Sequence, residues 1–158
     1  LGRDDKKINN YIKEMSKEGF NISKVNNSSE LCNKSNLIVT TTSANQSLIS
    51  KSDIMPGTHI TAVGSDTPEK RELDPAILGI SHCIVVDSIS QCRERGETKY
   101  ALDDKIIKEN DLIELGTVIE SGRKARIEQD EITVADLTGV AVQDIMITNA
   151  VYNKLNNK

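Results

Sequence analysis

The sequence lacks any long apolar run: no segment approaches the ~20 residues that a membrane-spanning helix needs. Its first residues, LGRDD, also lack the basic start and the apolar segment of a secretory signal. We therefore expect a cytoplasmic protein that does not associate with a membrane.

Cysteine and histidine are scarce. The three cysteines (Cys32, Cys83 and Cys92) are odd in number and show no C-x-x-C spacing, so they suggest neither a disulfide framework nor a zinc site. The two histidines, His59 and His82, share no metal-ligand spacing. We expect reduced thiols and no metal site.

An excess of basic charge is absent as well. The chain has 20 Lys and Arg against 24 Asp and Glu, for a formal net charge of −4. Binding to nucleic-acid phosphates needs a concentrated basic face, so we expect no nucleic-acid partner. A length of 158 residues with 37% hydrophobic and 28% charged residues fits one soluble domain with its own core.

Three short apolar runs each end at small polar residues. Leu37–Val39 is followed by TTTS, Ile60–Val63 by GSD and Cys83–Val86 by DS. Near-continuous apolar runs of this length are typical of strands that are buried on both faces of a parallel sheet. Ligands of such sheets bind beyond the carboxyl ends of the strands, which directs attention to these polar residues.

Helical periodicity and turn residues predict the remaining elements. We expect helices over Asp5–Glu18, Ala101–Glu109 and Leu112–Glu120, with Gly19 ending the first. Further strands are predicted over Phe20–Val25 and Ile132–Asp136, and a final helix follows Gly139. None of the nine glycines forms the G-x-G of a dinucleotide-binding loop, and the chain begins where the second strand of such a fold would end.

Five motifs in consistent order resemble those of the ornithine cyclodeaminase/mu-crystallin family. The most specific is residues 62–74, AVGSDTPEKRELD, and residues 136–144, DLTGVAVQD, are similar to a second family motif. Three shorter landmarks, at residues 56–59 (PGTH), 86–88 (VDS) and 114–116 (ELG), lie in the expected places. The resemblance covers essentially the whole chain.

The resemblance implies an α/β fold: a Rossmann-like three-layer sandwich with a mostly parallel sheet that lacks the first β-strand and the Gly-rich loop. Residues 1–139 would form a partial NAD(P)-binding domain, and residues 140–158 a C-terminal helix that packs on a missing N-terminal domain. Family members are homodimers that act on amino acids or imines. Some are cyclodeaminases, in which hydride leaves and returns to the substrate while ammonia is lost, and others reduce imines with NAD(P)H.

The resemblance also implies roles for individual residues. Asp66 matches the aspartate that moves a proton at the substrate amine, a task that suits a carboxylate whose pKa burial has raised. Thr138 matches a substrate-binding position. The cofactor-binding positions are Arg3, Thr40, Val63, Gly64, Ser65, Lys70 and Leu137. Leu137 replaces the usual serine, which removes a hydroxyl there.

Several alternatives stay open. Asp66 with Glu69 is also a plausible capping box, in which Asp66 caps a helix and Glu69 bonds back to it. Gly2 followed by Arg3 favours NADP slightly over NAD, because an acid at this place would repel a 2′-phosphate. The chain could also belong to a mu-crystallin-like protein that binds NADPH or a small ligand without catalysis. By itself we expect it to be inactive.

Overall fold

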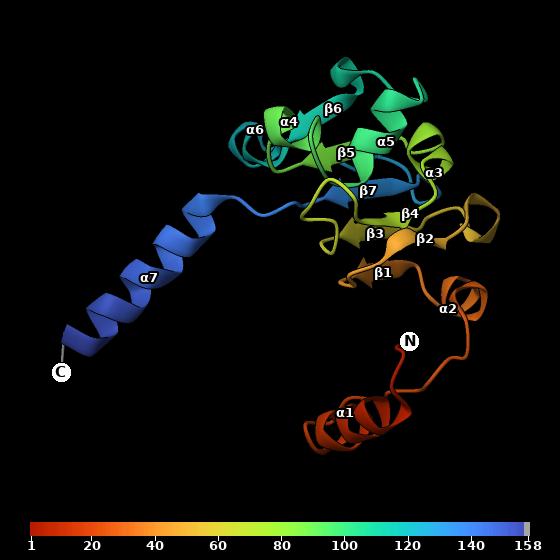
Figure 1. Ribbon diagram of the computed structural model, residues 1–158, viewed down its shortest axis with the longest axis vertical. Coiled ribbons are helices and arrows are strands. Elements are labelled where there is room, and N and C mark those ends of the chain that lie inside the picture. The colour runs from red at the N-terminus through yellow and green to blue at the C-terminus, as the bar shows by residue number, and fades with distance from the viewer. Residues whose placement is uncertain (157–158) are drawn as a thin grey trace.

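A five-stranded parallel sheet forms the centre of the computed structural model, which describes residues 1–156 (Figure 1). Its strands, in spatial order, are β1 (Leu37–Thr40), β3 (His59–Ala62), β7 (Thr133–Asp136), β5 (Cys83–Val86) and β6 (Leu112–Glu114). Every neighbouring pair is parallel. The parallel sheet, the three apolar strands and the strand near residue 132 are therefore confirmed.

One face of this sheet carries the core. Helices α2 (Ser28–Lys34), α3 (Ala76–Gly79), α4 (Ile89–Cys92) and α5 (Glu97–Asp103) contribute to it, as does a small parallel sheet of β2 (Asn45–Ile49) and β4 (Arg71–Leu73). Ile60, Ala62 and Val134 project from the strands into this core. The expected burial on both faces is wrong for Leu37 and Val39 of β1, which are 61% and 58% exposed because nothing in the described chain covers them.

The first helix is confirmed as α1 (Asp5–Lys17). Asp4 caps it by accepting hydrogen bonds from two backbone amides, and Gly19 follows it with a φ of 86°. The predicted strand over Phe20–Val25 is wrong. A strand needs a partner for its backbone groups, and this segment pairs with no other in the described residues.

The two helices predicted between residues 101 and 120 are also wrong in their bounds. Helix α5 ends at Asp103, and a 3₁₀ turn occupies Glu109–Asp111. Leu112 then begins β6 by pairing with Ile84, and only Leu115–Ser121 is helical, as α6. The apolar spacing in this segment suits a helix, but pairing along the edge of the sheet takes its first three residues.

The last helix, α7 (Ala141–Asn156), projects away from the sheet (Figure 1). It confirms the predicted C-terminal helix as far as residue 156, and residues 157–158 lie outside the described part. Its large apolar side chains are all at least half exposed; they are Val142, Ile145, Met146, Ile147, Val151, Tyr152 and Leu155. Within residues 1–156 no helix is both long and apolar enough to cross a membrane.

Candidate functional site

The carboxyl ends of the strands bring most of the predicted site residues to one edge of the sheet. The backbone amide of Val63, just after β3, donates to the carbonyl of Thr40 at the end of β1 (2.9 Å). The amide of Leu137, just after β7, donates to the carbonyl of Ala62 (2.9 Å). The positions expected to contact cofactor and substrate on β1, β3 and β7 are thus neighbours.

The loop after β3 alternates between exposed and buried residues. Val63 is 42% exposed, Ser65 is buried and Asp66 is exposed. A Cβ atom on Gly64 would lie 2.2 Å from the carbonyl oxygen of Thr42, so glycine is required by the packing of the chain itself. The resemblance makes Gly64 a cofactor-binding position, and the contact with Thr42 is a separate reason for glycine here.

Asp66 forms an ion pair with Lys70, in which the ammonium lies 2.5 Å from the carboxylate. After Asp66 the chain makes a turn that the Lys70 amide closes by donating to the Thr67 carbonyl (3.2 Å), and no helix begins there, so the capping-box alternative is wrong. The hydrogen bond from Lys70 lowers the pKa of Asp66, with a smaller contribution from the charge of Arg95. Burial raises this pKa, but the contacts with Lys70 outweigh it, so the expected net increase is wrong and Asp66 is ionised at neutral pH.

Two buried glutamates that the sequence did not single out hold the loops of this edge. The carboxylate of Glu72 accepts from the backbone amides of Thr42 (2.5 Å) and Gly64 (3.0 Å). The carboxylate of Glu97 accepts from the Ser65 hydroxyl and from the amides of Glu72 (2.8 Å) and Leu73 (2.9 Å). Burial raises the pKa of Glu97 to about 7, although its three donors lower it.

The substrate-binding position Thr138 belongs to a second polar cluster. Its hydroxyl donates to the carboxylate of Asp87 (3.1 Å) and accepts from the amide of Gln91 (2.6 Å). The backbone amide of Gly139 donates to the other oxygen of Asp87 (2.7 Å). Asp87, from the VDS landmark, therefore holds the turn that leads from β7 into α7.

Asp136 at the end of β7 is almost fully buried and accepts from the amide and hydroxyl of Thr98 (2.8 and 2.9 Å). Burial raises its pKa to about 6. Gly96, which directly precedes α5, has a φ of +89°, and a Cβ there would lie 2.7 Å from the Asp136 carboxylate. Glycine thus lets the start of α5 approach β7, which places Glu97 close to the site.

Among the described residues, one predicted site residue, Arg3, lies away from the others, and the hydroxyl of another, Thr40, has no hydrogen-bond partner. Arg3 precedes Asp4, the N-cap of α1, and this helix lies apart from the sheet (Figure 1). The Thr40 hydroxyl is buried and has no hydrogen-bond partner among the described residues. A buried hydroxyl without a partner is uncommon, so its place at the carboxyl edge fits a bound molecule that supplies the missing hydrogen bond.

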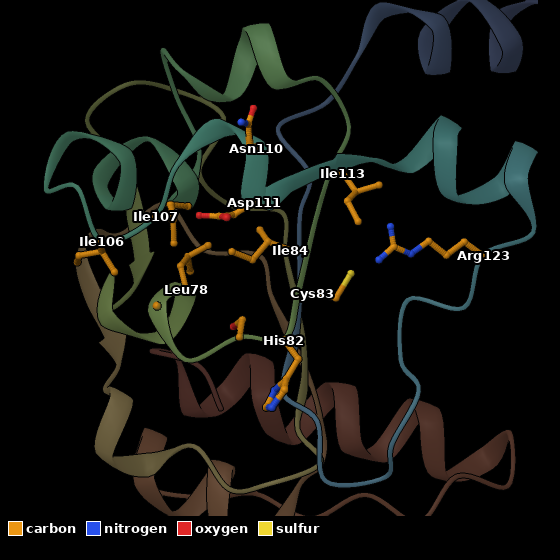
Figure 2. Close-up of a pocket in the computed structure, with 12 residues that line it drawn as sticks. Leu78, His82, Cys83, Ile84, Ile106, Ile107, Asn110, Asp111, Ile113 and Arg123 are labelled. Atoms are coloured by element: carbon orange, nitrogen blue, oxygen red, sulfur yellow. The ribbon is translucent and has the colours of Figure 1, made fainter.

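The hollow drawn in Figure 2 lies at the opposite edge of the sheet. It has a volume of about 410 Å³ and is lined by Cys83 at the amino end of β5 and by Asp111 just before β6. No predicted site residue lines it. Within the described residues, no group of three or more His, Cys, Asp and Glu side chains is placed to hold a metal ion.

Comparisons with known proteins cover the whole chain. The family model described as "Ornithine cyclodeaminase/mu-crystallin family" matches residues 1–158. The chain is 34% identical over 154 residues to the "Uncharacterized cyclodeaminase y4tK" of Sinorhizobium fredii, which covers 96% of this chain and 46% of the relative.

Two solved structures share the fold. The Delta(1)-pyrroline-2-carboxylate reductase of Thermococcus litoralis, in complex with NADH and L-proline, matches with a TM-score of 0.90 and 27% identity over 98% of this chain and 48% of that one. An archaeal alanine dehydrogenase dimer with bound NAD matches with a TM-score of 0.84 and 31% identity over 95% and 47%. This chain spans about half the length of the relatives that it matches.

Proposed function

Because the chain belongs to the ornithine cyclodeaminase/mu-crystallin family, we propose that it forms the NAD(P)-binding part of an amino-acid cyclodeaminase or of an imine or ketimine reductase. The observation that carries this proposal is the meeting of Thr40, the 63–66 loop and Thr138 at the carboxyl edge of one parallel sheet. Open parallel sheets bind their ligands at this edge. The relatives solved with NAD or NADH support the choice of ligand.

Nicotinamide, when bound, accepts or donates a hydride at the substrate carbon. At this edge, the unpartnered Thr40 hydroxyl and the exposed residue Val63 would contact a bound cofactor. The side chain of Ser65 is buried against Glu97, so a contact from Ser65 would come from its backbone. Leu137 is half-buried next to them and offers an apolar surface.

Asp66 is the proposed acid–base residue. It is exposed at the same edge, and its ionised carboxylate is the form that accepts a proton from a substrate ammonium as the amine becomes an imine, although the ion pair with Lys70 lowers its pKa and weakens it as a base. In the reverse direction the protonated carboxyl returns that proton. Lys70, which pairs with Asp66 here, would either keep this carboxylate in place or turn to the cofactor.

The helix α7 supports a proposed second contact surface. Its seven exposed apolar side chains form no core with the sheet. We propose that residues 140–158 pack on a further domain of the natural protein, and that this protein is a homodimer; the archaeal alanine dehydrogenase that it resembles is a dimer. The proposed NAD(P)-binding domain then comprises residues 1–139.

The isolated 158-residue chain is proposed to bind NAD(P) weakly and to be inactive. A dinucleotide pyrophosphate normally lies on a glycine-rich loop at the start of a helix, and no G-x-G occurs in this sequence. Calorimetry of the chain with NADH and NADPH tests this directly. Micromolar affinity would contradict it.

One experiment separates the candidate functions of the full-length protein. It is incubated with a cyclic imino acid and NADH or NADPH, and separately with a diamino acid and NAD. A reductase oxidises one nucleotide per imine, whereas a cyclodeaminase releases ammonia from the diamino acid without a net change in nucleotide. Binding of NADPH with neither reaction would favour the mu-crystallin-like alternative. Failure to bind either nucleotide would overturn the proposal.

A further inference from the structure

The loop that carries Asp66 is held by hydrogen bonds to two buried carboxylates, those of Glu72 and Glu97. Glu72 and Glu97 are 0% and 2% exposed, and between them they accept five hydrogen bonds. Burying a carboxylate is costly, and an apolar residue of similar volume would often stabilise a core equally well. The two acids therefore need an explanation beyond stability, and their donors supply one.

The donors link three segments of the candidate site. Glu97, the first residue of α5, binds two backbone amides of β4 and the hydroxyl of Ser65. Glu72, whose own amide Glu97 fixes, binds the amide of Gly64 after β3 and that of Thr42 after β1. The contacts thus run from Glu97 through Glu72 to Gly64, and directly from Glu97 to Ser65. Both routes end one or two residues before Asp66.

We propose that Glu97 is a positioning residue that fixes the loop of the proposed acid–base residue Asp66 through Ser65 and Glu72. Asp66 is itself exposed, and among the described residues its side chain bonds to no other side chain than that of Lys70. Its direction therefore depends on the backbone that carries it. Site residues are held in productive geometry when their supporting contacts are themselves buried and hydrogen-bonded. The role of Asp66 rests on the proposed function, whereas the placement of the loop does not.

Of the three donors to Glu97, the Ser65 hydroxyl is the one whose hydrogen bond is able to reverse its direction. The two backbone amides can only donate, but a hydroxyl can also accept. While Glu97 is ionised, the Ser65 hydrogen points to it. Once Glu97 is protonated, its buried O–H needs an acceptor, and Ser65 is the partner whose hydroxyl can turn to accept it. The loop should therefore respond to the ionisation of Glu97.

Burial raises the pKa of Glu97 to about 7, so this ionisation falls in the neutral range. Asp136 on β7 is the acidic group that raises this pKa further. Glu72 on β4 contacts Glu97 through its backbone amide, while its own carboxylate binds the amides of Thr42 and Gly64. The Ser65 hydroxyl acts in the opposite direction and lowers the pKa. Removing that hydroxyl should consequently raise the pH at which the loop responds.

The test is the backbone amide signals of residues 64–66 in the labelled 158-residue chain, followed by NMR across the neutral pH range. In the unchanged chain these signals should titrate with a midpoint near pH 7, because burial raises the pKa of Glu97 to about 7. The titration should vanish in Glu97→Gln and persist in Glu94→Gln, an exposed acid three residues earlier that serves as the matched control. A titration that survives Glu97→Gln would overturn the proposal.

Ser65→Ala keeps the proposal testable if Glu97→Gln does not fold. Here the midpoint should rise, and hydrogen exchange of the amides at residues 64 and 65 should accelerate roughly tenfold, as expected for the loss of a hydrogen bond to a charged group. An unchanged midpoint with unchanged exchange would overturn the positioning role.

Neither NMR measurement needs a nucleotide or a substrate, so the two proposals fail separately. A full-length protein that binds no nucleotide would overturn the proposed function and leave the loop result standing. In the full-length enzyme, Glu97→Gln should lower kcat at least tenfold with little change in the KM for nucleotide, and should alter the pH profile of kcat. Normal kcat and an unchanged profile would overturn the positioning role while the proposed function stands.

Discussion

The carboxylate of Glu72 occupies the space next to Gly64 where a side chain would project. An ideal Cβ on Gly64 would lie 2.5 Å from a Glu72 oxygen and 2.2 Å from the carbonyl oxygen of Thr42. The same carboxylate accepts a hydrogen bond from the Gly64 backbone amide. The close approach of this loop to β4 is therefore possible only without a Cβ atom.

Gly64→Ala should destabilise the chain by about 1–3 kcal/mol, the usual cost of forcing extra atoms into a well-packed site. The contact is with backbone as well as with a side chain, so a rotamer change cannot relieve it. The matched control is Gly116→Ala in α6, where nothing lies within 4 Å of the added methyl group. There alanine should be neutral or slightly stabilising. Urea unfolding measures both, and equal midpoints for the two variants would contradict the expectation.

Much of the architecture follows from residue patterns. The apolar runs at Leu37, Ile60 and Cys83 are strands because each is short, β-rich and bounded by polar residues. The strands β2 and β4 were missed because Asn45-Gln46-Ser47 is polar, and four of the five β2 residues are exposed. Their pairing depends on a chain segment 26 residues away. Phe20–Val25 shows the converse error, since its alternation suits a strand but no partner pairs with it.

The site is predictable only where a motif marks it. Asp66 and Thr138 belong to such motifs, and the structure places both at the carboxyl edge. Glu97 has no comparable signal, because an acid in the first turn of a helix is ordinarily an exposed partner of the helix dipole. Only the fold reveals that this one points inward to Ser65. Its raised pKa results from burial and could not be predicted from neighbouring residues.

Asp136→Asn should change how the stability of the chain depends on pH. Burial raises the pKa of Asp136 from its ordinary 3.8 to about 6, so the folded state holds this proton more tightly than the unfolded state does. The stability that results is fully present below the unfolded pKa and is lost as the pH rises through the folded one. The loss amounts to about 3 kcal/mol, at 1.36 kcal/mol for each unit of pKa.

Urea unfolding at a series of pH values from about 4 to 7 measures this effect as the difference between the unchanged chain and Asp136→Asn. The difference should fall with rising pH. Asp144→Asn, an exposed acid on α7, should give a curve parallel to that of the unchanged chain. A difference that stays constant, or that grows with pH, would contradict the raised pKa.

Asp66→Asn should lower the turnover of the full-length enzyme roughly 10²- to 10⁴-fold, because it removes the base and keeps the size of the side chain. Stability should change little, since an exposed ion pair such as that with Lys70 contributes roughly 0–1 kcal/mol. Asp66→Ser should be equally impaired. The control is Asp103→Asn, which breaks a similar exposed i,i+4 pair with Lys99. Near-normal turnover of Asp66→Asn at saturating nucleotide would remove Asp66 from the proton transfer.

Arg3→Ala should weaken binding of NADPH to the full-length protein more than binding of NADH. The preference follows from two adjacent residues. Gly2 presents no acid that would hold the ribose hydroxyls of NAD and repel a 2′-phosphate, and Arg3 offers a guanidinium to that phosphate. The Arg3 side chain is exposed beside α1, which lies apart from the sheet here (Figure 1), so the contact is predicted for the full-length protein.

A charge-assisted hydrogen bond of this kind contributes roughly 1.5–3 kcal/mol, so the affinity for NADPH should fall about 10- to 100-fold in Arg3→Ala. NADH lacks the 2′-phosphate, and its affinity should stay within a factor of about three, because it loses no such bond. Lys13→Ala, an exposed cation on α1, controls for the general loss of positive charge and should change neither affinity. The affinities of each protein for NADPH and NADH are measured by calorimetry at one fixed ionic strength, because contacts with phosphate weaken with salt. Equal losses for the two nucleotides would mean that Arg3 acts on a part that they share, and tighter binding of NADH than of NADPH by the unchanged protein would reverse the predicted preference.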